Sequence, residues 1–184
     1  MIIAVTGTPG VGKTTIARLL SERLGYEYVD LKDLAVSSGL AEPQGEEMAI
    51  DVERLPDVAR AKLEGKNAVV DGHLSHFLPA DVVIVLRTDP RVLAKRLEGR
   101  GYSKGKIADN VEAELIDLIL VEALERNDRV LEVDTTGKTP EEVVEEILNL
   151  LHSGVRKRVG VVDWTPYYDE LVEHLHVREG NENQ

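Results

Sequence analysis

The sequence contains no cysteine, and among its 184 residues it has only two methionines, one tryptophan and one phenylalanine. The absence of cysteine excludes disulfide bonds and thiolate metal sites. No apolar run approaches the roughly 20 residues that span a membrane, and the first residues enter an apolar stretch without a basic leader segment. We therefore expect a soluble, cytoplasmic protein with no membrane association.

The balance of charge is strongly acidic, because 34 aspartate and glutamate residues outnumber 22 lysine and arginine residues, for a net charge of −12. A surface that binds nucleic acid needs a concentration of basic side chains to neutralise phosphates. Direct RNA binding is therefore expected to be weak or absent, and a basic protein is a more suitable partner. The length and a hydrophobic content of 42% fit a single domain with one sizeable core.

Short apolar runs alternate with helical patterns along most of the chain. Two helix starts are well marked, at Asp89-Pro90 and at Thr139-Pro140, where Glu142 stands in the capping-box position. The alternation predicts an α/β fold, a five-stranded parallel sheet with helices on both faces, over residues 1–151. The expected strands are residues 1–6, 26–29, 68–70, 81–86 and 129–133.

Two segments do not fit as layers of that sheet. Residues 31–66 are acidic and partly helical, and residues 100–126 predict a lysine-rich turn followed by a long helix. Both are expected to be insertions above the sheet. Residues 152–184 form a C-terminal extension that carries a basic triplet at 156–158 and the tryptophan, Trp164.

The segment GTPGVGKT at residues 7–14 matches the pattern G-x-x-x-x-G-K-[ST], between an expected strand and an expected helix. Its glycines let backbone N–H groups converge on phosphates, Lys13 places a positive charge at the β and γ positions, and Thr14 offers a hydroxyl to magnesium. The alternative is an ordinary glycine turn. The motif predicts a kinase or ATPase that binds a nucleoside triphosphate with Mg²⁺.

Asp71 follows the expected strand at 68–70, where its carboxylate would face the phosphate loop. We assign it to magnesium or to the water shell of the ion, although it could merely cap the turn before Gly72. Asp89 is a weaker rival, since with Pro90 it is more simply explained as a helix cap.

Two further pairs of residues are candidates for chemistry. His73 and His76 follow Asp71 closely, and a histidine there is either structural or catalytic. Arg96 and Arg100 lie four residues apart and so share one helix face. Arginine suits the charge that develops on a transferring phosphoryl group, whereas the alternative is a solvated helix face.

These residues resemble the adenylate-kinase-like ribosome-assembly ATPases of archaea and eukaryotes, the family whose human member is called adenylate kinase isoenzyme six. The resemblance covers roughly residues 1–151 and rests on GTPGVGKTT, VDLKDLA, VVDGHLSH and RLEGRGYSKGKIADNVEAEL. It implies a P-loop NTPase fold of the nucleoside-monophosphate-kinase type. The monophosphate-binding insertion would span about residues 30–66 and the lid about residues 99–110.

The resemblance also implies roles for individual residues. Arg100 would contact ATP phosphates, Arg96 would lie against the adenine, and Lys138 of the 136–138 loop would help to hold the base. An Asp-x-His element, here Asp71 and His73, is tied to ATP hydrolysis in that family. The expected catalytic residues are thus Lys13, Asp71, His73 and Arg100, the metal residues Thr14 and Asp71, and the ATP-binding residues Gly10, Val11, Gly12, Lys13, Thr14, Thr15, Arg96, Arg100 and Lys138.

Two departures from related patterns bear on the acceptor. The Pro-Arg pair that follows Asp-Gly in ordinary adenylate kinases is absent, and Val36 stands where eukaryotic members of the family have an arginine. Lys32, Arg54 or Arg60 would then have to bind the acceptor phosphate.

The resemblance implies an adenylate kinase with ATPase activity that moves the γ-phosphoryl of ATP to AMP or to water. It also implies a role in maturation of the small ribosomal subunit, through a basic ribosomal protein of the platform. The alternative is another nucleoside-monophosphate kinase or a small-molecule kinase of the same fold.

Overall fold

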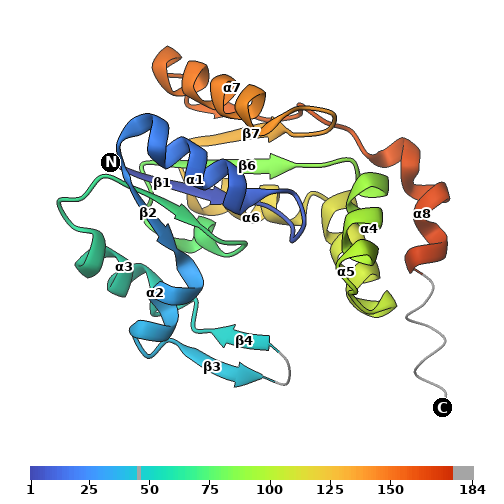
Figure 1. Cartoon of the computed structure of the whole chain (residues 1–184), viewed down its shortest axis with the longest axis horizontal. Coiled ribbons are helices and arrows are strands. Elements are labelled where there is room, and N and C mark those ends of the chain that lie inside the picture. The colour runs from blue at the N-terminus through green and yellow to red at the C-terminus, as the bar shows by residue number, and fades with distance from the viewer. Residues whose placement is uncertain (45–46, 176–184) are drawn as a thin grey trace.

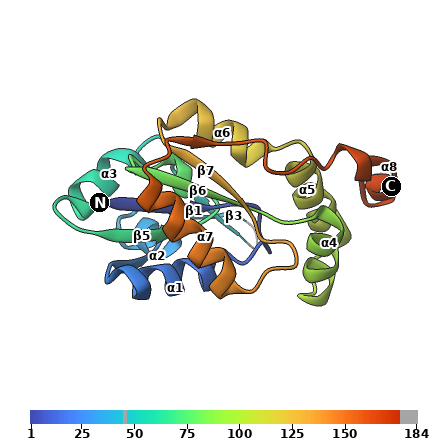
Figure 2. The same ribbon diagram turned by 90° about the horizontal axis from the view of Figure 1, so that it is seen from above.

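The computed structural model describes residues 1–44 and 47–175, and it is built on a six-stranded parallel sheet in the order β2-β5-β1-β6-β7-β8 (Figures 1 and 2). The five predicted strands are confirmed, with ends that shift by about one residue. The sixth strand was not predicted, because two residues carry no hydrophobic pattern. The strands are β1 (Ile2–Thr6), β2 (Glu27–Asp30), β5 (Ala68–Asp71), β6 (Val82–Arg87), β7 (Val130–Asp134) and β8 (Lys157–Arg158).

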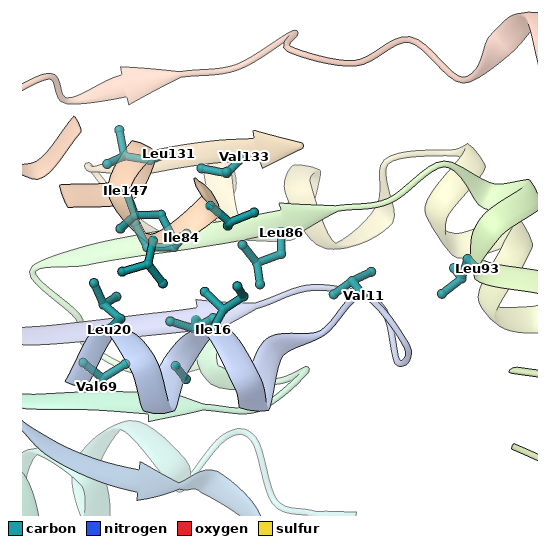
Figure 3. Close-up of a cluster of buried hydrophobic side chains, with 14 of the residues drawn as sticks. Val11, Ile16, Leu20, Val69, Ile84, Leu86, Leu93, Leu131, Val133 and Ile147 are labelled. Atoms are coloured by element: carbon teal, nitrogen blue, oxygen red, sulfur yellow. The ribbon is translucent and has the colours of Figure 1, made fainter. Parts of the chain in front are cut away.

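Helices cover both faces of the sheet, as predicted. One face packs against α1 (Lys13–Leu24) and α7 (Pro140–Ser153), and the opposite face packs against α6 (Leu118–Arg126) (Figure 2). In the first of these layers Ile16 and Leu20 of α1 meet Ile84 and Leu86 of β6 (Figure 3). Because both faces are buried, the strands read as continuous apolar runs rather than alternating ones.

The two marked helix starts are confirmed. The Asp89 side chain accepts a hydrogen bond from the Arg91 backbone N–H at the start of α4 (Pro90–Gly99). Thr139 and Glu142 exchange both hydrogen bonds of a capping box at the start of α7. These hydrogen bonds fix the first residues of α4 and α7.

The first insertion forms a separate layer around a second apolar cluster (Figure 1). Its helices are α2 (Leu31–Ser37) and α3 (Leu55–Leu63), and between them β3 (Ala41–Gln44) pairs antiparallel with β4 (Glu47–Ile50). The hairpin was not predicted, because AEPQ and EMAI contain, apart from Ile50, none of the β-branched and aromatic residues typical of strands.

The predicted long helix after the lysine-rich turn is wrong in one respect, because two helices occupy the segment. These are α5 (Lys104–Leu115) and α6, and Asp117 between them has φ 57°. Aspartate is one of the few residues that adopt this left-handed conformation at modest cost. The side chain of Asp117 accepts a hydrogen bond from Arg87, which holds the turn in place.

The C-terminal extension begins after α7 ends at Ser153, two residues later than the expected boundary. It contains β8, the short 3-10 turn η2 (Thr165–Tyr167) and α8 (Tyr168–Leu175), which lies beside α5 (Figure 1). The expected extension also includes residues 176–184, which lie outside the described residues. Within the described ranges no helix is long and apolar enough to cross a membrane.

Candidate nucleotide site

The candidate phosphate loop connects β1 to α1 at the carboxyl end of the sheet, where its backbone N–H groups stand at a helix N-terminus. All three of its glycines are held at positive φ. Gly7 has φ 144°, and a Cβ there would lie 2.7 Å from the Leu86 carbonyl oxygen. Gly12, with φ 96°, caps α1 in the left-handed conformation. The remaining loop residues of the predicted ATP site, Gly10 and Val11, lie between them.

Lys13 bends back over this loop. Its Nζ donates to the Gly7 carbonyl at 2.9 Å and to the Thr8 carbonyl at 3.1 Å. Burial lowers the pKa of Lys13 to about 8; Asp71 opposes that shift, and Arg100 adds to it by charge repulsion. The ammonium group is thus held at the loop, where it can meet a phosphate.

Thr14 and Asp71 meet directly below the loop. The Thr14 hydroxyl donates to Asp71 Oδ2 at 2.6 Å, and the Tyr28 hydroxyl donates to the same oxygen at 2.9 Å. Burial and the neighbouring Asp71 carboxylate raise the pKa of Tyr28 to about 12, so that its hydroxyl remains a donor. Thr15, the next residue of α1, is exposed at the same helix end.

This pair of oxygen donors fits a magnesium ion. Mg²⁺ is usually held by one or two carboxylates, water and the phosphates of the substrate rather than by a cage of protein ligands. Among the residues that the structure describes, no group of three or more His, Cys, Asp or Glu side chains could hold a metal alone. Thr14 and Asp71 would therefore hold the ion together with the nucleotide.

The two predicted arginines lie near the loop, Arg96 within α4 and Arg100 as the C-cap of that helix. Arg96 Nη1 donates to the Gly10 carbonyl at 3.1 Å. Arg100 is exposed at the C-terminal end of α4, close enough to Lys13 for its charge to lower the pKa of that lysine. The structure therefore brings Lys13, Thr14, Asp71, Arg96 and Arg100 together around one loop.

The two histidines differ in their surroundings. The side chain of His73 is exposed, and its backbone carbonyl accepts a hydrogen bond from Thr6 Oγ1 at 3.1 Å. His76 lies in the short 3-10 turn η1 (Ser75–Phe77) and is fully buried, with Nδ1 2.9 Å from Thr6 Oγ1 and Nε2 2.9 Å from Glu122 Oε2. The structural role therefore belongs to His76, and His73 is open to solvent.

Lys138 is paired away from the phosphate loop. Its Nζ donates to Glu146 of α7 at 2.8 Å, and Arg158 donates to the other oxygen of that carboxylate at 2.7 Å. A contact between Lys138 and a base would require this pair to open. Asp89, the rival metal residue, is hydrogen-bonded to Arg91, and this contact lowers the pKa of Asp89.

The candidate acceptor cations lie in the first insertion. Arg54 is 4.0 Å from Asp51, and Arg60 is 3.5 Å from Asp57, and all four side chains are substantially exposed. Lys32 is exposed near the start of α2, and Val36 is 51% exposed. None of these contacts marks one cation as the acceptor site.

Sequence reasoning missed Tyr28, Thr8 and Glu114. The Thr8 hydroxyl donates to Glu114 Oε2 at 2.7 Å, although the two residues are 106 positions apart. One pattern in the sequence could have drawn attention to Glu114, since it shares a helix face with Ile107 and Val111, and a carboxylate on an apolar face needs a partner.

The model of the AAA domain family matches residues 3–117. A protein of Thermococcus onnurineus is 66% identical over 175 residues, which cover 95% of this chain and 97% of the relative. A protein of Archaeoglobus fulgidus is 44% identical over 180 residues, with coverage of 95% and 98%. Both relatives are described as "Putative adenylate kinase".

Solved structures add evidence on the fold. Shikimate kinase from Acinetobacter baumannii in complex with shikimate aligns with a TM-score of 0.58 and 23% identity, over 85% of this chain and 95% of that one. Shikimate kinase from Aquifex aeolicus aligns with a TM-score of 0.54 and 21% identity, over 83% and 97%. The chain thus has the P-loop kinase fold and belongs to the archaeal family whose members are described as "Putative adenylate kinase".

Proposed function

We propose that this protein is an adenylate-kinase-like enzyme that transfers the γ-phosphoryl group of Mg²⁺-ATP to AMP, and to water when AMP is absent. The observation that carries the proposal is the hydrogen bond of 2.6 Å between Thr14 and Asp71, directly below a loop that holds Lys13. Enzymes with this loop use a hydroxyl and a carboxylate to hold Mg²⁺ and a lysine to bind the phosphates during phosphoryl transfer. The printed description of the relatives supports adenylate as the nucleotide.

In the proposed reaction an oxygen of the AMP phosphate attacks the γ-phosphorus, and the bond to the bridging oxygen of ATP breaks, so that two ADP molecules form. The loop N–H groups, Lys13 and Arg100 stabilise the negative charge that spreads over the phosphoryl oxygens. When bound, Mg²⁺ would neutralise phosphate charge, and Thr14 and Asp71 would hold it. Arg96, which donates to the Gly10 carbonyl of the loop, would lie against the adenine.

Hydrolysis differs from transfer only in the attacking oxygen. His73 is exposed on the turn that follows Asp71, and we propose that it places a water molecule for attack on the γ-phosphorus. The lid, about residues 99–110, would exclude other water when it closes over the nucleotide. Lys32, Arg54 or Arg60 of the 30–66 insertion would bind the AMP phosphate.

The test is an assay of ADP and phosphate formation with and without AMP. A kinase makes two ADP per ATP consumed only when AMP is present, whereas an ATPase releases phosphate in its absence. Lys13→Ala is expected to abolish both reactions in a folded protein, and Lys62→Ala, a matched change at an exposed lysine of α3, is expected to leave them intact. Normal turnover by folded Lys13→Ala would contradict the proposal.

We further propose that the enzyme acts in maturation of the small ribosomal subunit by binding a basic ribosomal protein of the platform. The net charge of −12 supports a basic partner, and the family resemblance supports a ribosomal one. Hydrolysis of ATP would change the affinity of the enzyme for that protein. A pull-down with and without ATP, followed by identification of the bound protein, tests this; recovery of no basic protein in either state would contradict it.

A second candidate is a kinase for another nucleoside monophosphate or for a small metabolite. It is favoured by Val36 at the expected arginine position, which leaves the acceptor site without its usual cation. A screen of phosphoryl acceptors decides between the two, since a preference for an acceptor other than AMP would support the second candidate.

A further inference from the structure

A cluster of buried charges lies behind the phosphate loop, outside the residues predicted for catalysis. Arg87, at the end of β6, is 2% exposed; it donates to Glu114 of α5 at 2.7 Å and to Glu132 of β7 at 2.8 Å. It also donates to the Glu114 carbonyl at 3.0 Å and to Asp117, which lies at the partly exposed side of the cluster. Because burying charges is costly, such a cluster is stable only when every member has partners. We call Arg87, Glu114, Asp117 and Glu132 the Arg87 cluster.

The C-terminal segment supplies two of these partners. The indole Nε1 of Trp164 donates to Glu114 Oε1 at 3.2 Å, and the backbone N–H of Val161 donates to Glu132 Oε2 at 2.9 Å. Trp164 is only 8% exposed, so its ring also keeps water away from the carboxylate. The extension therefore completes a cluster whose other members come from the nucleotide-binding core.

The other oxygen of Glu114 connects this cluster to the phosphate loop. Glu114 Oε2 accepts from the Thr8 hydroxyl at 2.7 Å, and the carbonyls of Gly7 and Thr8 are the two groups that hold Lys13 Nζ. The bond to Glu114 therefore restrains the backbone at Thr8, and a backbone shift there that broke this bond would also move the carbonyls that hold the lysine. One carboxylate joins the extension on one side to the loop that positions Lys13 on the other.

We propose that Thr8, Glu114 and Trp164 are positioning residues through which the C-terminal segment holds the phosphate loop in its nucleotide-binding shape. The inference rests on the proposed function, since it assumes that the loop binds ATP. Trp164 lies beyond the residues matched by the family model, and nothing about the G-x-x-x-x-G-K-[ST] pattern requires a partner for Thr8. In this proposal the C-terminal extension helps to position the phosphate loop of the nucleotide site.

The experiment uses Thr8→Val, which keeps the shape of the side chain and removes the hydroxyl. A hydrogen bond to a charged group is strong enough that its loss should raise KM for ATP roughly tenfold, with a smaller effect on kcat. Trp164→Phe, which keeps an aromatic ring but removes the donor, should raise KM in the same direction. Thr165→Val, a matched change at an exposed position beside Trp164, should leave KM unchanged.

A spectroscopic measurement separates positioning from a purely structural role. Trp164 is the protein's single tryptophan, so tryptophan fluorescence reports on the surroundings of this one ring, which include the Glu114 carboxylate. Saturating Mg²⁺-ATP should change the emission of the wild type and of Thr165→Val, and this change should be largely lost in Thr8→Val. An unchanged KM together with a wild-type emission response in Thr8→Val would overturn the inference.

The inference and the proposed function can fail separately. Failure of the wild type to bind Mg²⁺-ATP in a calorimetric titration would end the proposed function before any variant is made. The coupling of Thr8 to Trp164 through Glu114 is tested without nucleotide by a double-mutant cycle of Thr8→Val and Trp164→Phe, measured by denaturant unfolding. Because both side chains bond to one carboxylate, their effects on stability should be non-additive. Strict additivity would overturn this coupling.

Discussion

The charge of Lys13 depends on pH in the range where enzymes are assayed. Its pKa is lowered to about 8, so the ammonium is charged below that pH and becomes neutral as the pH rises through it. We expect kcat/KM for ATP to be level near neutral pH and to fall above about pH 8, because this parameter reports the free enzyme. Bound phosphates favour the charged form, so kcat should fall at higher pH. A kcat/KM that stays level well above the pKa would contradict this assignment.

Asp71 is expected to act through its charge as well as its shape. Asp71→Asn keeps an oxygen that accepts from Thr14, but it removes the carboxylate that would hold the metal and its water. We expect turnover to fall about a hundredfold and the magnesium requirement to rise. Asp89→Asn is the matched control, since asparagine also caps helices well. A magnesium titration that is normal for Asp71→Asn and altered for Asp89→Asn would reverse the assignment.

The two histidines provide a separate prediction at the residue scale. His73→Ala should lower ATP hydrolysis about a hundredfold more than it lowers transfer to AMP, with little change in the thermal midpoint, because the side chain is exposed. His76→Ala should cost about 2 kcal/mol of stability, because it removes a fully buried ring together with its hydrogen bonds to Thr6 and Glu122. Equal loss of both activities in His73→Ala, with a lower midpoint, would show that His73 is structural.

Local sequence predicted some of these residues and could not predict others. Lys13, Thr14 and Asp71 were predictable because a parallel sheet places the ends of neighbouring strands and the loop after β1 at one edge. The contact between Glu114 and Trp164 was not, since these residues lie 50 positions apart and meet only through tertiary packing. The burial of His76 likewise depends on α6, which supplies Glu122.

At the scale of elements, the sequence predicted the start of a helix correctly where capping residues mark that start. The starts of α4 and α7 follow from Asp89-Pro90 and from the Thr139 capping box. The break between α5 and α6 was not predictable, because the left-handed Asp117 is held by Arg87 from a distant strand. The β3–β4 hairpin carries no strand pattern, and its paired outer residues Ala41 and Ile50 pack against the second apolar cluster.

The capping box of α7 leads to a prediction about stability. Thr139→Ala removes the oxygen that accepts from the Glu142 N–H at 3.2 Å, and we expect a loss of about 1 kcal/mol in the free energy of unfolding. Thr139→Ser retains the hydroxyl and should be nearly neutral. Denaturant unfolding of the three proteins measures the difference. An alanine variant as stable as the wild type would show that the cap contributes nothing in this context.

At the scale of the whole molecule, the net charge of −12 shapes how a basic partner would associate. If a basic ribosomal protein is the partner, its association rate should fall severalfold when ionic strength rises from about 0.05 to about 0.3 M, since salt screens long-range attraction. The dissociation rate should change less. Surface plasmon resonance at several salt concentrations measures both rates, and an association rate independent of salt would exclude electrostatic attraction as the driving force.

The short strand β8 has a consequence for how copies of this protein behave toward one another. Without it, β7 would be the last strand of the sheet and would offer a row of unpaired backbone groups to any neighbouring chain. An uncovered strand edge is a common starting point for aggregation, and proteins often protect it with a very short, charged strand. Lys157 and Arg158 are such a strand. The same extension that contacts Glu114 through Trp164 therefore also covers the edge of the sheet at Val130 and Leu131 against a neighbouring chain.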